Sequence, residues 1–178
     1  AKCKSFETKE EATKAFEKGY EHYLKTVSSS KAAAGLAPKA PVGKPIWESL
    51  CVDAACSGNP GDMEYRGVYP PTMQEIFRIG PLKKGTDNIG EFLALVHGLA
   101  LLKQKGSSLP IYSDSRNAIG WVKKKKCKTL LERVPENEPI FDMIERAEKW
   151  LKTNTYTTPI LKWETSEWGE IPADFGRK

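Results

Sequence analysis

The sequence lacks the features that mark membrane-spanning, secreted and zinc-stabilised proteins. It contains no apolar run long enough to cross a membrane, so we expect no membrane partner. No charged segment followed by an apolar run opens it, so nothing predicts secretion. Its four cysteines show no C-x-x-C spacing and no partner histidines, which disfavours a zinc site and favours reduced thiols in a cytosol. We therefore expect a cytoplasmic protein.

The chain has 178 residues, which is enough for one domain of ordinary size and an appendage. Hydrophobic residues make up 39% of it, and five Trp and six Phe supply large apolar groups for a core. The formal net charge of +5 favours a polyanionic partner only weakly. Composition alone therefore selects no function.

Three segments of different composition follow one another. Residues 8–27 are predicted to form a helix, because Thr8 and Glu11 have the spacing of a capping box and apolar residues recur at helical intervals. Residues 28–45 are rich in Ser, Ala, Gly, Pro and Lys, which is typical of a flexible linker. We predict a helical segment over 1–27, a linker over 28–45 and a folded domain over 46–178.

The hydrophobic pattern of that domain predicts an α/β fold. Three strands joined by short links suggest an antiparallel meander, and a strand that follows a helix is expected to run parallel to the first strand. The expected fold is a mixed five-stranded sheet, with three antiparallel strands and two parallel ones, flanked by helices. The expected strands and helices, in chain order, cover residues 46–53, 65–70, 73–80, 88–106 (helix), 109–114, 115–126 (helix), 137–152 (helix) and 159–165.

Four carboxylates lie at or near the ends of these elements. Asp53 ends the first predicted strand and Asp114 ends the fourth, while Glu91 lies in the first turn of the long helix. Asp174 lies in "GEIPADFG" near residue 178. Each has an ordinary explanation, because Asp114 could cap the next helix and Asn88 with Glu91 has the spacing of a capping box. Asp53 could be a turn residue and Asp174 a solvated charge, so no single acid indicates a site.

Their combination favours another interpretation. If strands one and four are parallel neighbours, Asp53 and Asp114 meet at the sheet edge where open α/β sheets place their sites, and Glu91 can reach it. Three ionised carboxylates about 5 Å apart repel by roughly 3 kcal/mol per pair at an effective dielectric of about 20. Either a cation lies between them or one carries a proton. Oxygen ligands without His or Cys suit Mg²⁺ or Mn²⁺, and acids around two such ions suit phosphodiester hydrolysis.

Four segments resemble, in order, the signature segments of type I ribonuclease H. They read "VDAACSGNPG", "GTDNIGEFLALVHGLALL", "IYSDSRNAIGWV" and "KWETSEWGEIPADFGRK". The resemblance covers residues 46–178 and is strongest with the bacterial subgroup whose sequence ends soon after the last catalytic Asp. The segment "KCKSFETKEEATKAF" resembles the end of the small hybrid-binding, viroplasmin-like domain that often precedes the catalytic domain, and most of that domain would be missing.

The resemblance implies an endonuclease that hydrolyses the RNA strand of RNA/DNA hybrids without reading sequence. In the family, four acids hold two divalent ions, Mg²⁺ with Mn²⁺ as a substitute, around the scissile phosphate. One ion activates the attacking water and the other stabilises the leaving oxygen, which leaves 5′-phosphate and 3′-hydroxyl ends. By position, these catalytic and metal-binding acids are Asp53, Glu91, Asp114 and Asp174.

The loop before the last acid departs from many family members, which carry a catalytic His there. The loop "ETSEWGEIPAD" has none, and Glu170 matches the acid that the subgroup carries instead. The resemblance implies that Glu170 helps to release product or metal. The chain's two histidines, His22 and His97, lie elsewhere, and we expect His97 to pack against neighbours of its helix.

The resemblance also implies contacts with the hybrid, whose 2′-hydroxyls lie in a wide minor groove. Asn59 and neighbouring backbone groups would contact these hydroxyls, and a pocket around Thr129 would hold a phosphate of the DNA strand. Asp87 stands where the subgroup more often has Asn and should weaken binding, while Arg116 replaces a more usual Gln and adds a positive charge. The substrate-binding residues by position are Cys56, Ser57, Asn59, Thr86, Asp87, Asn88, Arg116 and Thr129.

A basic run, "VKKKKCK" over residues 122–128, follows Trp121. It could be a solvated helical face, but its closeness to Thr129 favours a surface that tracks phosphates. Two alternatives share the fold: a catalytically silent hybrid-binding module, which has no reason to keep four repelling acids, and a DNA recombinase or exonuclease. Because fold does not imply function, the choice rests on the site. We expect a monomer whose partner is an RNA/DNA hybrid, with no protein partner evident.

Overall fold

The computed structural model describes residues 43–176. The helix predicted at 8–27 and most of the linker predicted at 28–45 lie outside the described residues. In chain order the elements are β1 (Leu50–Cys56), β2 (Gly61–Tyr69), β3 (Gln74–Gly85), α2 (Asp87–Gln104), β4 (Ile111–Ser113), α3 (Arg116–Lys124), the 3-10 turn η1 (Pro135–Asn137), α4 (Glu138–Thr153), β5 (Ile160–Lys162) and α5 (Thr165–Trp168).

The five strands form one mixed sheet in the order β3-β2-β1-β4-β5. β1 pairs antiparallel with β2, and β2 pairs antiparallel with β3. β4 pairs parallel with both β1 and β5. The predicted fold class is therefore confirmed, including the parallel placement of the first and fourth strands.

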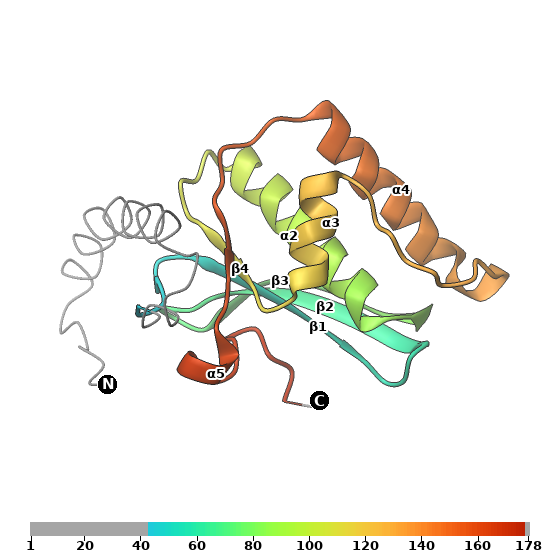
Figure 1. The fold of residues 1–178 in the computed structure, drawn as a ribbon, viewed down its shortest axis with the longest axis horizontal. Coiled ribbons are helices and arrows are strands. Elements are labelled where there is room, and N and C mark those ends of the chain that lie inside the picture. The colour runs from blue at the N-terminus through green and yellow to red at the C-terminus, as the bar shows by residue number, and fades with distance from the viewer. Residues whose placement is uncertain (1–42, 177–178) are drawn as a thin grey trace, which may run out of the picture.

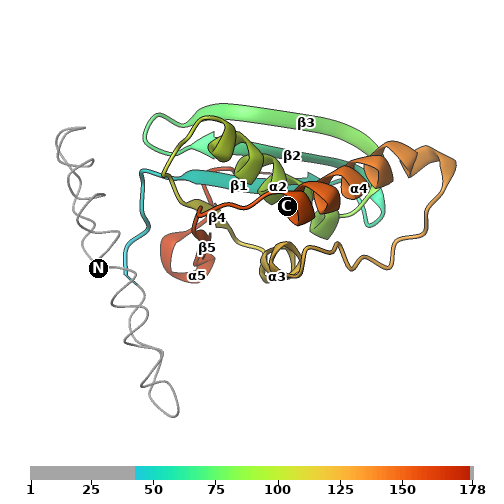
Figure 2. The same cartoon turned by 90° about the horizontal axis from the view of Figure 1, so that it is seen from above.

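The sheet separates two packed layers (Figure 1). Helices α2, α3 and α4 lie on one side, and α5 with the C-terminal segment lies on the other; Figure 2 shows the same arrangement from above. The larger core cluster lies between the sheet and the three helices. Its largest buried side chains are Tyr65 of β2 and Phe92 of α2. A smaller cluster joins Cys51 and Tyr112 of the sheet to Trp163, Ile171 and Ala173 on the other side. None of the described helices is both long and apolar enough to span a membrane.

The predicted positions of several strands were shifted. β1 begins at Leu50 rather than at residue 46, and it continues to Cys56 rather than ending at Asp53. Residues 46–49 are held by side chains instead of a ladder: the Ile46 N–H donates to the Tyr112 hydroxyl at 2.9 Å. β3 extends to Gly85, well beyond the predicted residue 80, and α5 was not predicted as a helix. The apolar run at 46–53 was therefore mistaken for a strand over its whole length.

Candidate active site

The candidate site lies where β1 and β4 stop pairing. Their parallel ladder joins Leu50 to Ile111 and Cys51 to Tyr112. Two residues further along each strand come Asp53 and Asp114, which share the same register but lie beyond the last ladder pair. Asp53 thus lies inside β1 rather than at its end, because β1 continues its pairing with β2 as far as Cys56.

Helix α2 supplies the third acid. Its N-cap is Thr86, whose hydroxyl accepts from the Ile89 N–H at 3.3 Å, so the proposed capping pair of Asn88 and Glu91 is wrong. Because the N-cap is Thr86 and not Asn88, Glu91 lies two residues further from the cap than the predicted pair places it. There its Oε1 accepts a hydrogen bond from the backbone N–H of Ala54 at 3.2 Å.

The bond to Ala54 explains how a helix residue enters the sheet. The Leu50 N–H donates toward β4, to the Pro110 carbonyl at 2.9 Å. Since N–H groups of a strand alternate in direction, the N–H of Ala54 points to the same side, where β4 has already left the ladder. Glu91 therefore takes the position of a missing strand partner. This is a structural role for one of its oxygens, in addition to any role in catalysis.

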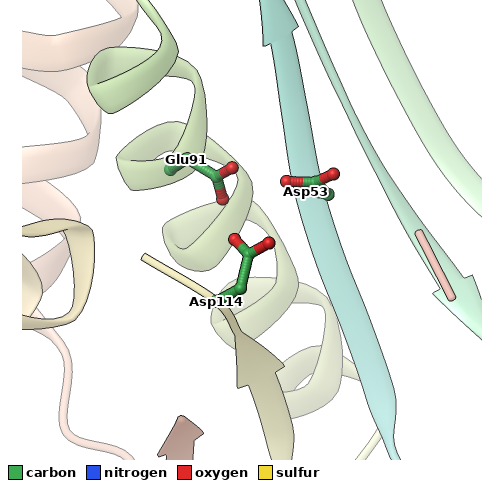
Figure 3. Close-up of side chains that lie close together, drawn as sticks. All are labelled: Asp53, Glu91 and Asp114. Carbon is green, nitrogen blue, oxygen red and sulfur yellow. The ribbon is translucent and has the colours of Figure 1, made fainter. Parts of the chain in front are cut away.

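Asp53, Glu91 and Asp114 form a tight carboxylate group (Figure 3). One oxygen of each lies within 4.8 Å of the others, and the three side chains point toward a common centre. Asp53 is 0% exposed and Glu91 is 4% exposed, while Asp114 is half-buried. At that separation each pair of charges repels by about 3 kcal/mol at an effective dielectric near 20. The predicted clustering of these acids is therefore found.

The ordinary explanations of these acids do not hold. Ser115, not Asp114, caps α3, because its hydroxyl accepts from the Ala118 N–H at 3.1 Å. Asp53 lies in a strand and is not a turn residue. Since Ser115 caps α3 and Asp53 lies within a strand, neither capping nor a turn explains the carboxylates at positions 53 and 114.

The donor set fits a hard divalent cation. Carboxylate oxygens are the ligands that Mg²⁺ and Mn²⁺ prefer. One buried oxygen of Asp53, Oδ2, and one of Glu91, Oε2, accept no hydrogen bond within the described residues, although both side chains make other interactions. Burial raises the pKa of the Cys51 thiol, two residues before Asp53, to about 12, so this thiol is protonated at neutral pH.

Asp174 is not a member of the three-carboxylate group. It lies in the segment after α5, where its N–H donates to the Ile171 carbonyl at 2.8 Å. Arg66 of β2 donates from Nη2 to the Asp174 carbonyl at 2.6 Å. Arg66 pairs directly with Asp53 across the β1–β2 ladder, so the residue that holds the Asp174 carbonyl starts from the strand position opposite Asp53. Glu170 is exposed four residues earlier, and the metal-binding role of Asp174 and the release role of Glu170 stay predictions.

Several predicted substrate-binding residues lie where the β1–β2 turn meets the start of α2. Gly61 pairs with Gly85, and the Cys56 thiol donates to the Gly85 carbonyl at 3.4 Å, which attaches the β1–β2 turn to the start of α2. This brings together exposed residues of two elements. Ser57 and Asn59 come from the turn, and Asp87 and Asn88 are the first residues of the helix.

Thr129 lies on a segment attached to the same end of β3. The Asn137 side-chain amide donates to the Lys84 carbonyl at 3.2 Å and to the Glu132 carbonyl at 2.9 Å. These bonds attach the segment to β3 at Lys84, two residues before Thr86. The Thr129 hydroxyl accepts from the Leu131 N–H at 3.1 Å. Arg116 is exposed as the first residue of α3. The phosphate-binding roles of these residues stay predictions.

The basic run is exposed along residues 123–126 and at Lys128. One member is already engaged, because Lys126 Nζ lies 3.4 Å from Glu148 Oε2. Trp121 is turned inward and meets Phe92 edge-to-face, with ring centroids 6.3 Å apart. The run is therefore a charged surface, while the Trp that precedes it belongs to the packed layer.

His97 is a packing residue, as predicted, but its partners lie on the sheet and not on its own helix, and it is not part of the carboxylate group. Its ring stacks on Phe77 with centroids 4.0 Å apart, and its Nδ1 lies 3.1 Å from the Tyr65 hydroxyl. Burial lowers the pKa of His97. The prediction that this histidine serves packing is confirmed.

Sequence reasoning missed Arg66 and both helix caps. Arg66 carries no motif of its own, and its position opposite Asp53 depends on a strand register that only the fold sets. Thr86 and Ser115 did carry a signal, because a hydroxyl residue directly before a helical pattern favours an N-cap. That signal was hidden by Asn88 and Asp114, which suit the same kind of position.

No family model matches the chain. A ribonuclease H from Rhodopirellula baltica is 40% identical over 75 residues, which is 41% of this chain and 46% of that protein. A ribonuclease H from Rippkaea orientalis is 32% identical over 102 residues, which is 54% of this chain and 62% of that protein. The chain therefore spans about half the length of the curated relatives it matches.

Among solved structures, the RNase H1 from the halophilic archaeon Halobacterium salinarum NRC-1 is 18% identical and superposes with a TM-score of 0.41. The superposition covers 66% of this chain and 86% of that one. The strand order of the present chain is established independently by its own hydrogen-bonded pairs. The resemblance to ribonuclease H that the sequence predicted is confirmed by the curated relatives; the subgroup and the remnant of a hybrid-binding domain stay predictions.

Proposed function

We propose that the chain is an endonuclease that hydrolyses the RNA strand of RNA/DNA hybrids, because it is similar to curated ribonucleases H and gathers three of the expected acids. The observation that carries the proposal is the approach of Asp53, Glu91 and Asp114 to within 4.8 Å of one another. Buried carboxylates that repel one another destabilise a fold, and a bound cation would offset this repulsion.

The mechanism assigns distinct tasks to the acids. Asp53, Glu91 and Asp114, joined by Asp174, would hold two Mg²⁺ ions, or Mn²⁺ in their place. When bound, such ions supply Lewis-acid activation of water and stabilisation of the leaving 3′ oxygen, which gives 5′-phosphate and 3′-hydroxyl ends. The strand and the helix contribute rigidity: Asp53 lies within a paired strand, and one oxygen of Glu91 is fixed by the N–H of Ala54. Glu170, exposed on the loop before Asp174, is assigned to release of product or metal.

Recognition of the hybrid is assigned to the two loops beside the carboxylate group. Asn59, with backbone groups of Cys56 and Ser57, would contact 2′-hydroxyls, which distinguish RNA from DNA. Thr86, Asn88 and Thr129 would hold a phosphate of the DNA strand. None of these contacts reads a base edge, so cleavage is proposed to be independent of sequence.

Charge around the site modulates the same contacts. Asp87 is exposed beside the phosphate-binding residues and would lower affinity, while Arg116 would raise it. The exposed lysines over residues 123–126 would track the backbone and make affinity fall with salt. The proposal includes a monomer that acts in the cytoplasm.

The test is incubation of the full chain with labelled RNA/DNA hybrid, duplex RNA and duplex DNA, with Mg²⁺ or with a chelator. The expected result is cleavage of the RNA strand of the hybrid alone, and its loss with chelator. Binding of hybrid without cleavage at any Mg²⁺ or Mn²⁺ concentration would instead identify a silent binding module. Cleavage of duplex DNA would identify a DNA nuclease of the same fold.

A further inference from the structure

The segment over residues 171–176 carries Asp174 but belongs to no helix or strand. Its first part is held by burial, because Ile171 is 1% exposed and Ala173 is 0% exposed in the smaller core cluster. Burial of these two side chains fixes where the segment lies on the sheet. Within the segment the Asp174 N–H donates to the Ile171 carbonyl at 2.8 Å, while Asp174 itself is half-buried.

Arg66 of β2 holds two carbonyls of this backbone from outside the segment. Its Nε donates to the Ala173 carbonyl at 2.8 Å and its Nη2 donates to the Asp174 carbonyl at 2.6 Å. Two donors of one planar group thus hold two consecutive carbonyls. A guanidinium is suited to this task because its N–H groups form a rigid fork, whereas a lysine ammonium is a single charge on a flexible stem.

The guanidinium of Arg66 is itself held from two directions. Glu75 of β3 lies 3.7 Å away, from Oε1 to Nη1. The ring of Phe175 lies beneath it, with 4.9 Å from Cζ to the ring centroid, and Arg78 lies 5.1 Å from the same centroid. The residue after Asp174 is therefore held by the same group that holds Asp174, and the Arg66 side chain is only 23% exposed.

Register connects this tether to the carboxylate group. Arg66 is the cross-strand partner of Asp53, so both side chains lie on the same face of the sheet. We propose that Arg66 is a positioning residue, which holds the backbone of residues 173–174 so that the Asp174 carboxylate is presented to the group formed by Asp53, Glu91 and Asp114. The proposal rests on the proposed function and adds to it the residue that connects the fourth acid to the other three.

The variants to compare are Arg66→Lys, Arg66→Met and the control Arg78→Met. Arg78 touches the same ring and the same Glu75, at 3.5 Å, but makes no bond to the Ala173 and Asp174 carbonyls. If charge alone mattered, Arg66→Lys would behave as wild type. If the fork matters, Arg66→Lys is impaired as Arg66→Met is.

Three measurements test the proposal. The Mg²⁺ concentration for half-maximal hybrid cleavage should rise by roughly tenfold in both Arg66 variants, as for other residues that orient metal ligands, and should stay near wild type in Arg78→Met. Mn²⁺ binding without substrate, followed by calorimetry, should weaken in the same order. Amide hydrogen exchange at residues 174–176 should speed up in the Arg66 variants only.

An Asp174→Asn background separates positioning from general damage. There, adding Arg66→Met should leave Mn²⁺ binding unchanged, because the carboxylate that Arg66 orients is already gone. An undiminished further loss in that background, or equal effects of Arg66→Met and Arg78→Met, would overturn the proposal.

Failure of the proposed function would look different. A wild-type chain that cuts no hybrid contradicts the nuclease assignment, while hydrogen exchange and Mn²⁺ binding still decide on Arg66. Melting temperature in chelator verifies folding of each variant, and Arg66→Lys, which keeps the charge opposite Glu75, provides the test if Arg66→Met does not fold.

Discussion

The Oε1 atom of Glu91 accepts a hydrogen bond from the backbone N–H of Ala54 at 3.2 Å, across 37 positions of sequence. The acceptor is in a helix and the donor is the residue after Asp53, so one bond fixes the spacing of two acids of the site. Glu91 therefore has both a structural role and a proposed catalytic role, and substitutions at this position can separate the two roles.

Two replacements of Glu91 should have different effects on stability. Glu91→Gln keeps a carbonyl oxygen for the Ala54 N–H and removes a charge from the repelling group, so stability in chelator should equal or exceed that of wild type. Glu91→Ala leaves the N–H without this acceptor and should be less stable than Glu91→Gln by about 1–3 kcal/mol. Urea denaturation in chelator measures the difference. Both variants should lose cleavage, and a Glu91→Gln protein of normal activity would contradict the catalytic assignment.

Divalent ions should stabilise the wild-type protein and not Asp114→Asn. Because a ligand that binds only the folded state stabilises it by mass action, Mg²⁺ or Mn²⁺ should add about 2.7 kcal/mol at a hundredfold excess over its dissociation constant. Asp114→Asn should be at least as stable as wild type in chelator, because repulsion is relieved. It should also bind hybrid without cutting it. A melting temperature that rises equally in both proteins on adding Mn²⁺ would place the ion elsewhere.

Gly90 permits the close approach of α2 to β1 and should not tolerate a side chain. A Cβ there would lie 2.7 Å from the Ala54 Cβ, so Gly90→Ala must push the helix away from the strand beside Asp53. We expect a loss of about 1–3 kcal/mol from overpacking, and a higher Mn²⁺ requirement because Glu91 moves.

Gly120 of α3 is the matched control for Gly90. A Cβ at Gly120 would meet nothing within 4 Å, so Gly120→Ala should be neutral or stabilising by up to about 1 kcal/mol through helix propensity. Denaturation curves and Mn²⁺ titrations of both variants make the comparison. Similar behaviour of the two would show that helix approach at Gly90 does not control the site.

His97 should make stability fall with acid below neutrality. Because burial lowers its pKa in the folded state, the unfolded chain binds a proton more readily than the folded one does. Its contribution is fully present above the ordinary histidine pKa of about 6.5 and is lost as pH falls toward the folded pKa. The neighbouring Tyr65 has a pKa raised by burial and does not titrate in this range.

The variant that tests this is His97→Gln, which keeps polar atoms near the Tyr65 hydroxyl but does not titrate. Unfolding free energies at about pH 7.5 and pH 5.5 should differ less in the variant than in the wild type. His22 is present in both proteins and cancels in the comparison. An unchanged difference would show that another group causes the acid sensitivity.

Thr129 should contribute to hybrid binding without affecting metal. Thr129→Ala should weaken binding of an uncleaved hybrid in chelator by roughly tenfold, about the value of one hydrogen bond to a charged group. Thr129→Ser keeps the hydroxyl that accepts from the Leu131 N–H and should bind nearly as wild type does. A shift of the Mn²⁺ titration in Thr129→Ala would count against a separate phosphate pocket.

The order of elements and the approach of the acids could be predicted from the sequence. Alternation, helical spacing and turn residues are local signals, and the rule for parallel strands then brings Asp53 and Asp114 to one place. The element ends were less accurate: Ile46 and Trp47 are apolar, but the Ile46 N–H is held by the Tyr112 hydroxyl and not by a ladder. The caps were wrong because Asn88 and Asp114 suit the same kind of position as Thr86 and Ser115, which cap the helices.

The function of Arg66 was beyond prediction from the sequence. Its partners are backbone carbonyls more than a hundred residues away, at separations of 107 and 108 positions. A backbone carbonyl has no side-chain signature, and the pairing of Arg66 with Asp53 depends on a register that a shift of one residue would reverse. Long-range contacts of side chains with irregular backbone are therefore where the structure adds most.

The indole Nε1 of Trp168 donates to the carbonyl of Gly43 at 2.7 Å, which joins positions 125 residues apart. Gly43 is the first described residue, and Trp168 is the last residue of α5. The bond therefore joins the residues ahead of β1 to the short helix that follows β5, so the two ends of the described sequence are attached to each other outside the sheet.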